Sequence, residues 1–556
     1  MLETVELSKL EIVLYFYFLG IVFIYLGEIF YSFLINKNKN KSHSFRYSFL
    51  PIFGIFITSN FLVFWNFFSG TANNFILFLF FILFLVSLRS NLSLIKNYVF
   101  YFINLTILFL SSTTIGISKD ANLYHLQQQS WLRDEKIVLG ISNINPYLGY
   151  SSIIEYINSI LWFENNYIFI HFVGIYIIAS IFDLFFKFLK SNNSSYKNFV
   201  FLFLTIGILD NFGFEGGRNG FLFIQEIFKY DDIFAALTLF FISYFFITFK
   251  ESPNAENQNV LIFIFLFSAQ TRFVGHLLLI YFFVLLYKNK YQMKGQKLFA
   301  PLFFYLIFVM KNILSSTCLW FPIQLTCLSI LPFYQPSQAE YISKLLLNVN
   351  KIPNSNAKTD ISTVEFLENF VLTQSSYLLN FLITCLIAII FFTVFRKKIS
   401  INFSQIVLSI LIFSIWLFSA PTYRFGVPFF LSIYFVLFFR YLMETKINIP
   451  RYLKNLPNFL LLFVVLTLVR FDSILALQNF DSIELKIEKE VISFIDIEDG
   501  WMKYSEPHTV NNYLCGDIKL CYVEEFYSSK VESSFNYYYF IPNNKYYFVE
   551  ELENNG

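Results

Sequence analysis

The amino-acid sequence predicts an all-α polytopic membrane protein with about 14 transmembrane helices, and roughly 12 to 14 are compatible with it. Of its 556 residues, 56% are hydrophobic and only 14% are charged, whereas a soluble domain is about 45–50% apolar and about one quarter charged. Apolar runs of about 20 residues, the length that crosses a bilayer core of about 30 Å, recur along the chain. Clusters of Lys and Arg separate many of these runs, as in multi-pass membrane proteins.

The first apolar run is expected to stay in the protein as a membrane anchor. The segment Met1 to Glu11 carries Glu3 and Glu6 as well as Glu11, whereas a cleavable signal begins with a positively charged region. The run that follows is also long enough to span the bilayer.

The basic clusters predict the orientation of the helices, because Lys and Arg accumulate in cytoplasmic loops. Counting from these loops gives about 14 crossings, with both termini on the outer side. The clusters are Lys37 to Arg46, Arg89 to Lys96, Lys187 to Lys197, Lys288 to Lys297, Arg396 to Lys398 and Arg440 to Lys454.

The count requires the stretch Val260 to Tyr287 to consist of two short helices, divided near Gln270 to Arg272. If this stretch were one helix, a further span would also have to be miscounted to keep both flanking basic loops in the cytoplasm.

The chain is expected to divide into a polytopic membrane domain, residues 1–471, and an extracytoplasmic tail, residues 472–556. The tail is polar and acidic and contains several Tyr, so it is expected to form a small outer domain or an ordered cap of low regularity. The outer side should also receive three loops of the membrane domain, residues 118–166, 210–231 and 312–370, and the turn from Pro421 to Gly426.

The charge balance argues against nucleic acid as a partner. The 40 Lys and Arg residues nearly cancel the 38 Asp and Glu residues, which leaves a formal charge of +2. Proteins that bind nucleic acid carry a clear basic surplus. Membrane lipid is the partner that the composition predicts, and the sequence does not indicate an oligomeric state.

Several motifs carry a resemblance. The first outer loop reads S-K-D-A-N-L-Y-H-L-Q-Q-Q-S-W-L from Ser118, followed by V-L-G-I-S-N-I-N-P-Y-L-G-Y-S-S from Val138. G-R-N-G, K-Y-D-D-I-F-A-A and K-N-I-L-S-S-T-C-L-W-F-P-I-Q-L-T-C begin at Gly217, Lys229 and Lys311. From about Ser118 onward, the chain resembles a poorly characterised family of bacterial polytopic membrane proteins with a D-x-x-L-Y-H-L-Q-like segment.

The organisation of that family is similar to that of the GT-C glycosyltransferases. The resemblance implies a GT-C-like fold in the bacterial inner membrane and transfer of a sugar from a polyprenyl-phosphate carrier at the outer face, in assembly of cell-envelope glycans. GT-C enzymes use an acidic residue in the first large outer loop. The sequence departs from their common signature, because Asp120 has no acidic neighbour that would complete a D-x-D or D-E pair.

Asp120 is the candidate catalytic base, because an attacking sugar hydroxyl must lose a proton. In a regular helix from Ala121, one stripe would carry Tyr124, Gln127 or Gln128, and Trp131, which suits a sugar because rings stack on it and amides bind its hydroxyls. His125 projects away from this stripe, so no direct dyad with Asp120 is implied. The expected substrate-binding residues of this loop are Tyr124, His125, Gln128 and Trp131. The simpler alternative is that Asp120 only caps the helix with its side-chain oxygen.

Two further outer segments carry an Arg beside Gly. Arg218 and Asn219 lie in E-G-G-R-N-G, and Arg424 lies in P-T-Y-R-F-G. A guanidinium there could bind a lipid phosphate with two hydrogen bonds. The alternative is an Arg that merely reaches the headgroups from the membrane boundary.

Arg272 and His276 lie at the expected helix break, where an ionisable group at membrane depth indicates a functional site. Arg272 is an expected substrate-binding residue, and a stabilising ion pair with Asp210 or Glu226 is the alternative. Asp231 and Asp232 open a helix, where the helix dipole explains them, although they could also hold a divalent cation. No His or Cys pattern has the spacing of a metal site.

The Cys residues predict two disulfides. Cys318 and Cys327 lie in one outer loop and Cys515 and Cys521 in the tail, whereas Cys385 lies within a span. Close pairs on an oxidising side favour two small disulfide-closed loops.

Two other function classes remain open beside a glycosyltransferase. One is a transporter or flippase of envelope saccharides, which would need charged residues near mid-membrane, where the spans are nearly free of charge apart from the Arg272 region. The other is a non-catalytic envelope assembly protein whose loops bind partners.

The predicted orientation can be tested with a reporter that is active only in the cytoplasm. Fused after Lys398 the reporter should be active, because this site follows a basic loop, and fused after Gly556 it should be silent. The reverse pattern would overturn the orientation.

Overall fold

The structure is a computed structural model that describes most of the membrane domain and part of the tail. The described residues are 9–35, 45–72, 78–79, 81–86, 92–118, 120–143, 145–150, 152–162, 167–211, 224–227, 229–251, 254–288, 290, 298–335, 339–340, 343, 364, 368, 371, 379, 383, 386, 402–419, 423–444, 455–475, 495–498, 501–504, 529–534 and 537–542.

The chain folds mainly into α-helices. In chain order they are α1 (Lys9–Leu34), α2 (Arg46–Asn66), α4 (Val99–Phe109), α5 (Leu126–Asp134), α6 (Ile154–Ser159), α7 (Ile168–Lys190), α8 (Ser194–Asn211), α9 (Tyr230–Lys250), α10 (Ala255–Thr271), α11 (Leu279–Tyr287), α12 (Phe299–Ser316), α15 (Phe403–Ser419), α16 (Tyr423–Glu444), α17 (Leu456–Val469) and α18 (Phe471–Leu475). Shorter helical turns are η2 (Leu92–Tyr98), η3 (Leu110–Thr113), η4 (Ala121–His125), η5 (Ile141–Asn143), η6 (Pro146–Gly149), η8 (Phe273–Leu278) and η9 (Gln324–Thr326).

Seven helices within the described residues are long and apolar enough to cross a membrane. They are Leu10–Leu34, Arg46–Asn66, Ile95–Thr113, Ile168–Lys190, Tyr230–Lys250, Phe299–Ser316 and Phe425–Met443. This confirms a helical, multi-pass integral membrane protein, and the larger count of about 14 spans stays a prediction.

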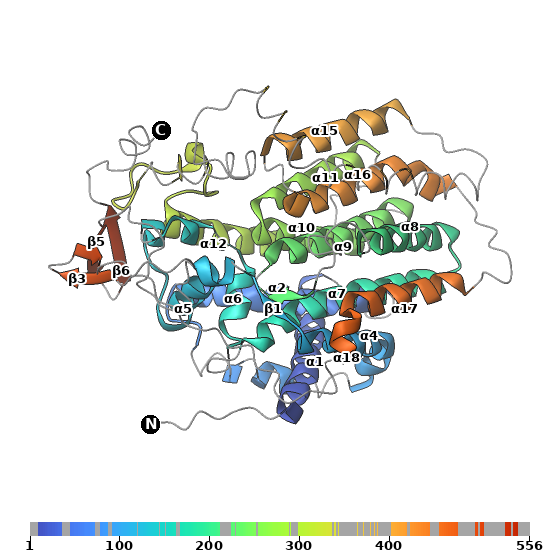
Figure 1. Cartoon of the computed structure of the whole chain (residues 1–556), viewed down its shortest axis with the longest axis horizontal. Helices are drawn as coiled ribbons and strands as arrows, with labels where there is room; N and C mark the ends of the chain where they lie inside the picture. Colours follow the sequence, from blue (N-terminus) through green and yellow to red (C-terminus); the bar gives the residue numbers. More distant parts are fainter. Residues whose placement is uncertain are drawn as a thin grey trace.

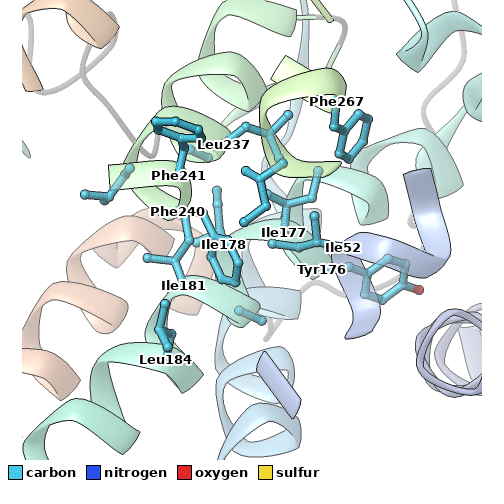
Figure 2. Packing of buried hydrophobic residues seen from close by; sticks show 14 of the residues in the cluster. Ile52, Tyr176, Ile177, Ile178, Ile181, Leu184, Leu237, Phe240, Phe241 and Phe267 are labelled. Atoms are coloured by element: carbon cyan, nitrogen blue, oxygen red, sulfur yellow. The ribbon is translucent and has the colours of Figure 1, made fainter. Parts of the chain in front are cut away.

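Helices α7 and α9 form the centre of the bundle. About 94% of the apolar window of α7 and 89% of that of α9 are buried, against 39% for α12. Ile178 of α7 and Phe240 of α9, drawn in Figure 2, belong to one continuous apolar core. By contrast, Phe299 and Met310 of α12 are exposed, as expected for a helix that faces lipid. The core therefore positions the central helices, and the polar loops are attached to their ends.

Helices α1 and α2 cross at two glycines. A Cβ atom on Gly27 would lie 2.1 Å from the carbonyl oxygen of Leu50, and one on Gly54 would lie 2.0 Å from that of Phe23. Small residues let helix backbones approach closely in membranes. Here each helix presents a glycine to the backbone of the other, so the crossing depends on both.

The stretch from Val260 to Tyr287 is divided where the sequence predicted. Helix α10 ends at Thr271, Arg272 has an extended backbone (φ −145°, ψ 137°), and η8 begins at Phe273. The side-chain amide of Gln258, near the start of α10, donates to the carbonyl of Lys290 beyond α11 at 2.7 Å. The two limbs are therefore antiparallel, and Arg272 lies at the turn between them.

Segments predicted to share a side of the membrane lie at the same end of the bundle. The amide of Gly140 donates to Leu314 at the end of α12, and the amide of Ile153 donates to Gln270 at the end of α10. Strands β1 (Gly116–Ile117) and β2 (Glu226–Ile227) pair in parallel and join two more of these segments. Figure 1 shows α5 and α6 together at this end of the horizontal helices. We call it the loop end.

At the opposite end of the bundle, acidic side chains within the helices form ion pairs with basic ones. Glu28 of α1 lies 3.5 Å from Arg46 of α2, and Asp183 of α7 pairs with Lys187 one turn later. The expectation that the spans are nearly free of charge apart from Arg272 therefore needs correction, because Glu28 and Asp183 are buried within α1 and α7. Each buried acid has a cationic partner, as the low dielectric requires.

The tail contains a four-stranded antiparallel sheet in the order β3 (Ile495–Glu498), β4 (Trp501–Tyr504), β5 (Ser529–Ser534) and β6 (Tyr537–Pro542). It lies at the loop end, where β6 approaches η5 (Figure 1). The described residues of the tail thus include regular structure, and the predicted small outer domain or ordered cap of low regularity stays a prediction.

Substituting either crossing glycine should destabilise the protein. Gly27→Ala and Gly54→Ala place a methyl group against a backbone carbonyl, and overpacking of this kind costs about 1–3 kcal/mol. Thermal unfolding in detergent should show a lower midpoint for both variants. The matched control is Gly174→Ala in α7, because a Cβ there would meet nothing within 4 Å. Equal midpoints for all three variants would contradict the close crossing.

Candidate functional site

The candidate site is built on the first loop of the loop end, where residues Ala121 to His125 form a single π-helical turn, η4, that leads into α5. Such turns are rare and occur often at functional sites, because the extra residue redirects the side chains that follow. Asp120 precedes this turn and is half-buried. Its side chain makes no capping hydrogen bond, although its backbone amide donates to the Ser118 hydroxyl at 3.2 Å. The capping bond of the simpler alternative is thus not formed.

The carboxylate of Glu155, on α6, fixes this turn in place. One of its oxygens binds Nδ1 of His125. The other accepts from the side-chain amide of Gln129 at 2.7 Å and from the hydroxyl of Tyr230 at 2.7 Å. Asn158 also donates to the Tyr230 hydroxyl, at 3.0 Å, and the indole of Trp162 donates to Gln129 at 2.6 Å. This buried network joins η4, α5, α6 and the start of α9.

Three tyrosines form an aromatic cluster beside Asp120. The ring of Tyr124 stacks on that of Tyr147 at 5.7 Å between centroids, and Tyr150 lies 6.3 Å from both. We call Tyr124, Tyr147 and Tyr150 the tyrosine cluster. Phe321 packs edge-on against Tyr150 at 5.9 Å. The cluster joins η4 to the loop after α5, and Phe321 connects it to the loop after α12.

The Tyr150 hydroxyl lies within electrostatic reach of both Asp120 and Arg272. Burial raises its pKa well above the usual value, Tyr124 and Tyr147 raise it further, Arg272 lowers it, and Asp120 raises it. This hydroxyl is buried and has no hydrogen-bond partner among the described residues. An acid and a cation therefore both influence this phenol.

The guanidinium of Arg272 binds the carboxylate of Asp231 at 2.9 Å. Asp231, at the start of α9, is therefore a partner of Arg272, and Glu226 pairs with Lys229 at 3.3 Å. The side chain of Asp210, which the sequence offered as another partner, lies outside the described residues. The Arg272 side chain keeps 22% of its surface exposed, whereas Asp231 keeps 4%. In this ion pair the Asp231 carboxylate is buried, whereas part of the Arg272 guanidinium side chain remains accessible to solvent.

Nothing in the described part of the chain indicates a metal centre, since it holds no group of three His, Cys, Asp or Glu residues that could bind an ion. Asp231 is engaged by Arg272. The divalent cation suggested for Asp231 and Asp232 stays a prediction.

His276 is part of a second small network next to the turn. Its Nε2 lies 2.7 Å from the hydroxyl of Tyr305, which also accepts from the indole of Trp320 at 3.3 Å. A disulfide joins Cys318 and Cys327, the first of the two expected pairs. Trp320 and Phe321 lie inside the loop that this disulfide closes. The loop after α12 is thereby held against the site.

The π turn divides the expected sugar-binding stripe between two surfaces. Tyr124 contacts Tyr147 within the tyrosine cluster. The side-chain oxygen of Gln127 accepts a hydrogen bond from the side-chain amide of Asn145 at 3.1 Å. Gln128 and Trp131 instead line a cavity of about 20 Å³ that also contacts Lys311 of α12. His125 points to Glu155. Of the four binding residues expected in this loop, only Tyr124 thus lies in the tyrosine cluster.

The remaining candidates cannot be placed in the site. Arg218, Asn219, Cys515 and Cys521 lie outside the described residues, and so does the side chain of Arg424, whose backbone lies in the first turn of α16.

Sequence reasoning missed Glu155, Tyr147 and Tyr150. Glu155 is the lone acid in the otherwise uncharged segment S-S-I-I-E-Y-I-N-S-I-L. A carboxylate in such a segment must be bound by several donors if it is buried, so this position carried a usable signal. Tyr147 and Tyr150 carried no comparable signal, because Tyr is frequent throughout the chain.

Comparisons with known proteins identify a family. The family model described as "Domain of unknown function (DUF8201)" matches residues 10–431, which is more than half of the chain and includes every residue of the site described above. No curated protein and no solved structure matches the sequence.

The dependence of the site on Glu155 can be tested by Glu155→Gln. The amide has the same shape but turns a donor toward His125 or Gln129, and losing a hydrogen bond to a charged group costs about 1.5–3 kcal/mol. The thermal unfolding midpoint in detergent should fall. Asp134→Asn, at the exposed end of α5, is the matched control and should leave it unchanged. An unchanged midpoint for Glu155→Gln would show that the network does not hold the loops together.

Proposed function

This chain belongs to the family described as DUF8201, which brings no activity with it, and from the site we propose that it is a membrane glycosyltransferase of GT-C-like organisation. In this proposal it acts on a polyprenyl-phosphate-linked saccharide at the outer face of a bacterial inner membrane, in assembly of the cell envelope. About 14 spans and outer termini are part of the proposal.

One observation carries the proposal. Asp120 and Tyr124 follow α4, Tyr147 and Tyr150 follow α5, and Arg272 follows α10. The rings of Tyr124 and Tyr147 lie beside that of Tyr150, and Asp120 and Arg272 lie within electrostatic reach of its hydroxyl. A carboxylate, aromatic rings and a guanidinium are the groups that a sugar attached to a phosphate needs for proton transfer, stacking and charge.

The proposed roles follow from the chemistry of each group. Asp120 accepts the proton of the acceptor hydroxyl while that oxygen forms a bond to the anomeric carbon. The bond from this carbon to the phosphate oxygen breaks, and the carrier phosphate leaves with the electron pair. Arg272, held by Asp231, stabilises the charge on that phosphate. Tyr124 and Tyr150 hold the sugar ring by stacking, and Arg218 or Arg424 remain proposed as further phosphate ligands.

The experiment replaces Asp120 by Asn in the native host and measures lipid-linked saccharides by mass spectrometry of lipid extracts. The amide keeps the size of the side chain but cannot accept the proton, and loss of a general base costs about 10²- to 10⁴-fold in rate. The polyprenyl-linked intermediate should therefore accumulate. Asp134→Asn is the matched control, with an exposed carboxylate fourteen residues further along the same loop, and should not accumulate it.

A second measurement separates transfer from transport. Spheroplasts are treated with a glycosidase that cannot enter the cytoplasm. If the protein transfers sugar, the accumulated intermediate lies on the outer face and is digested. An intermediate that resists digestion would instead identify a flippase. Full activity of a folded Asp120→Asn protein would exclude Asp120 as base and favour an assembly protein without catalysis.

A further inference from the structure

A long apolar groove runs along the bundle, away from the candidate site. It has a volume of about 750 Å³ and lies between α9, η8, α11, α15 and α16, in the upper part of Figure 1. Pockets of about 300–1,000 Å³ are typical of sites that bind small molecules. Most of its lining is apolar and aromatic, including Phe245, Leu277, Tyr281, Ile412 and Phe435.

The length of the groove matches a lipid chain. Its wall on α16 extends from Pro428 to Met443, and this separation corresponds to about 22 Å at 1.5 Å per residue. The hydrocarbon core of a bilayer is about 30 Å thick. The groove therefore follows most of the membrane, and a compact ligand would fill only a part of it.

The two ends of the groove differ in charge. Lys288, Arg440, Asn402 and Gln405 line one end, and Arg440 donates to the Asn402 side chain at 2.8 Å. The side-chain amide of Gln405 donates to the carbonyl of Val436 at 2.7 Å, so α15 and α16 are antiparallel there. At the other end the lining residues include Phe234, Val274 and Ile415, which are apolar.

We propose that this groove binds one anionic phospholipid from the leaflet on the side of the basic loops. An acyl chain lies along the groove, and the phosphate lies between Lys288 and Arg440. Charge complementarity selects this ligand, because both cations lie at the end remote from Arg272. A carrier lipid bound at Arg272 would place its phosphate at the opposite end. The site is independent of the glycosyl transfer proposed above.

Lipid binding can be measured by native mass spectrometry of the full chain in detergent, with phosphatidylglycerol and phosphatidylcholine of identical chains as probes. The wild type should bind one phosphatidylglycerol in preference to phosphatidylcholine. Each cation near a membrane surface contributes about 1 kcal/mol to binding an anionic lipid, so Lys288→Gln with Arg440→Gln should weaken binding about 30-fold. Lys190→Gln with Lys197→Gln removes two cations that do not line the groove and is the matched control.

A second variant tests the groove itself. Leu408→Trp fills it while leaving both cations in place, and it should also reduce phosphatidylglycerol binding. Equal binding of the two lipids, an equal loss in the control pair, or full binding by Leu408→Trp would each overturn the proposal. A photoreactive side chain at Ile412 should crosslink to lipid. A crosslink to another segment of the chain or to a second copy would mean that protein occupies the groove.

Discussion

The loop end depends on one buried carboxylate. Glu155 is almost fully buried, and a charge can be taken out of water only where donors replace its hydration. His125, Gln129 and Tyr230 supply these donors from η4, α5 and α9. None of the three elements can move without leaving that charge unsatisfied. The η4 turn, which follows Asp120 and carries Tyr124, is thus held in place through His125.

The helix break at Arg272 has a similar effect on the opposite wall of the site. Because α10 stops at Thr271 and the chain returns in η8, an Arg that would lie within a continuous span lies at a turn instead. Asp231 holds it there from the start of α9. The break therefore reverses the direction of the chain and also places Arg272 at the candidate site.

The two ends of the bundle handle polar groups differently. At the end of the basic clusters, Glu28 and Asp183 are each compensated locally, by Arg46 and Lys187. At the loop end, the Glu155 carboxylate is surrounded by hydrogen-bond donors, and Arg272 keeps an exposed surface. Arg272 is also paired, with Asp231, but its side chain keeps 22% of its surface exposed, whereas that of Arg46 keeps 9%.

The sequence by itself determined the properties that depend on local composition. A run of apolar residues must enter lipid, and a turn must follow where the chain returns, so the membrane class and the division near Arg272 were both predicted. The disulfide between Cys318 and Cys327 could also be predicted, because the two residues are only nine positions apart in one loop.

Only the tertiary structure decided which side chains meet. Glu155 and Tyr230, Tyr124 and Tyr147, and Arg272 and Asp231 are brought together by the packing of whole segments. A regular helix was the reasonable prediction after Asp120, and the π turn that replaced it moved Gln128 and Trp131 to another surface. A hydropathy pattern reflects how favourably each residue enters lipid, which is a local property. The side-chain pairs depend on how segments far apart in the sequence pack together, and a local pattern does not contain that information.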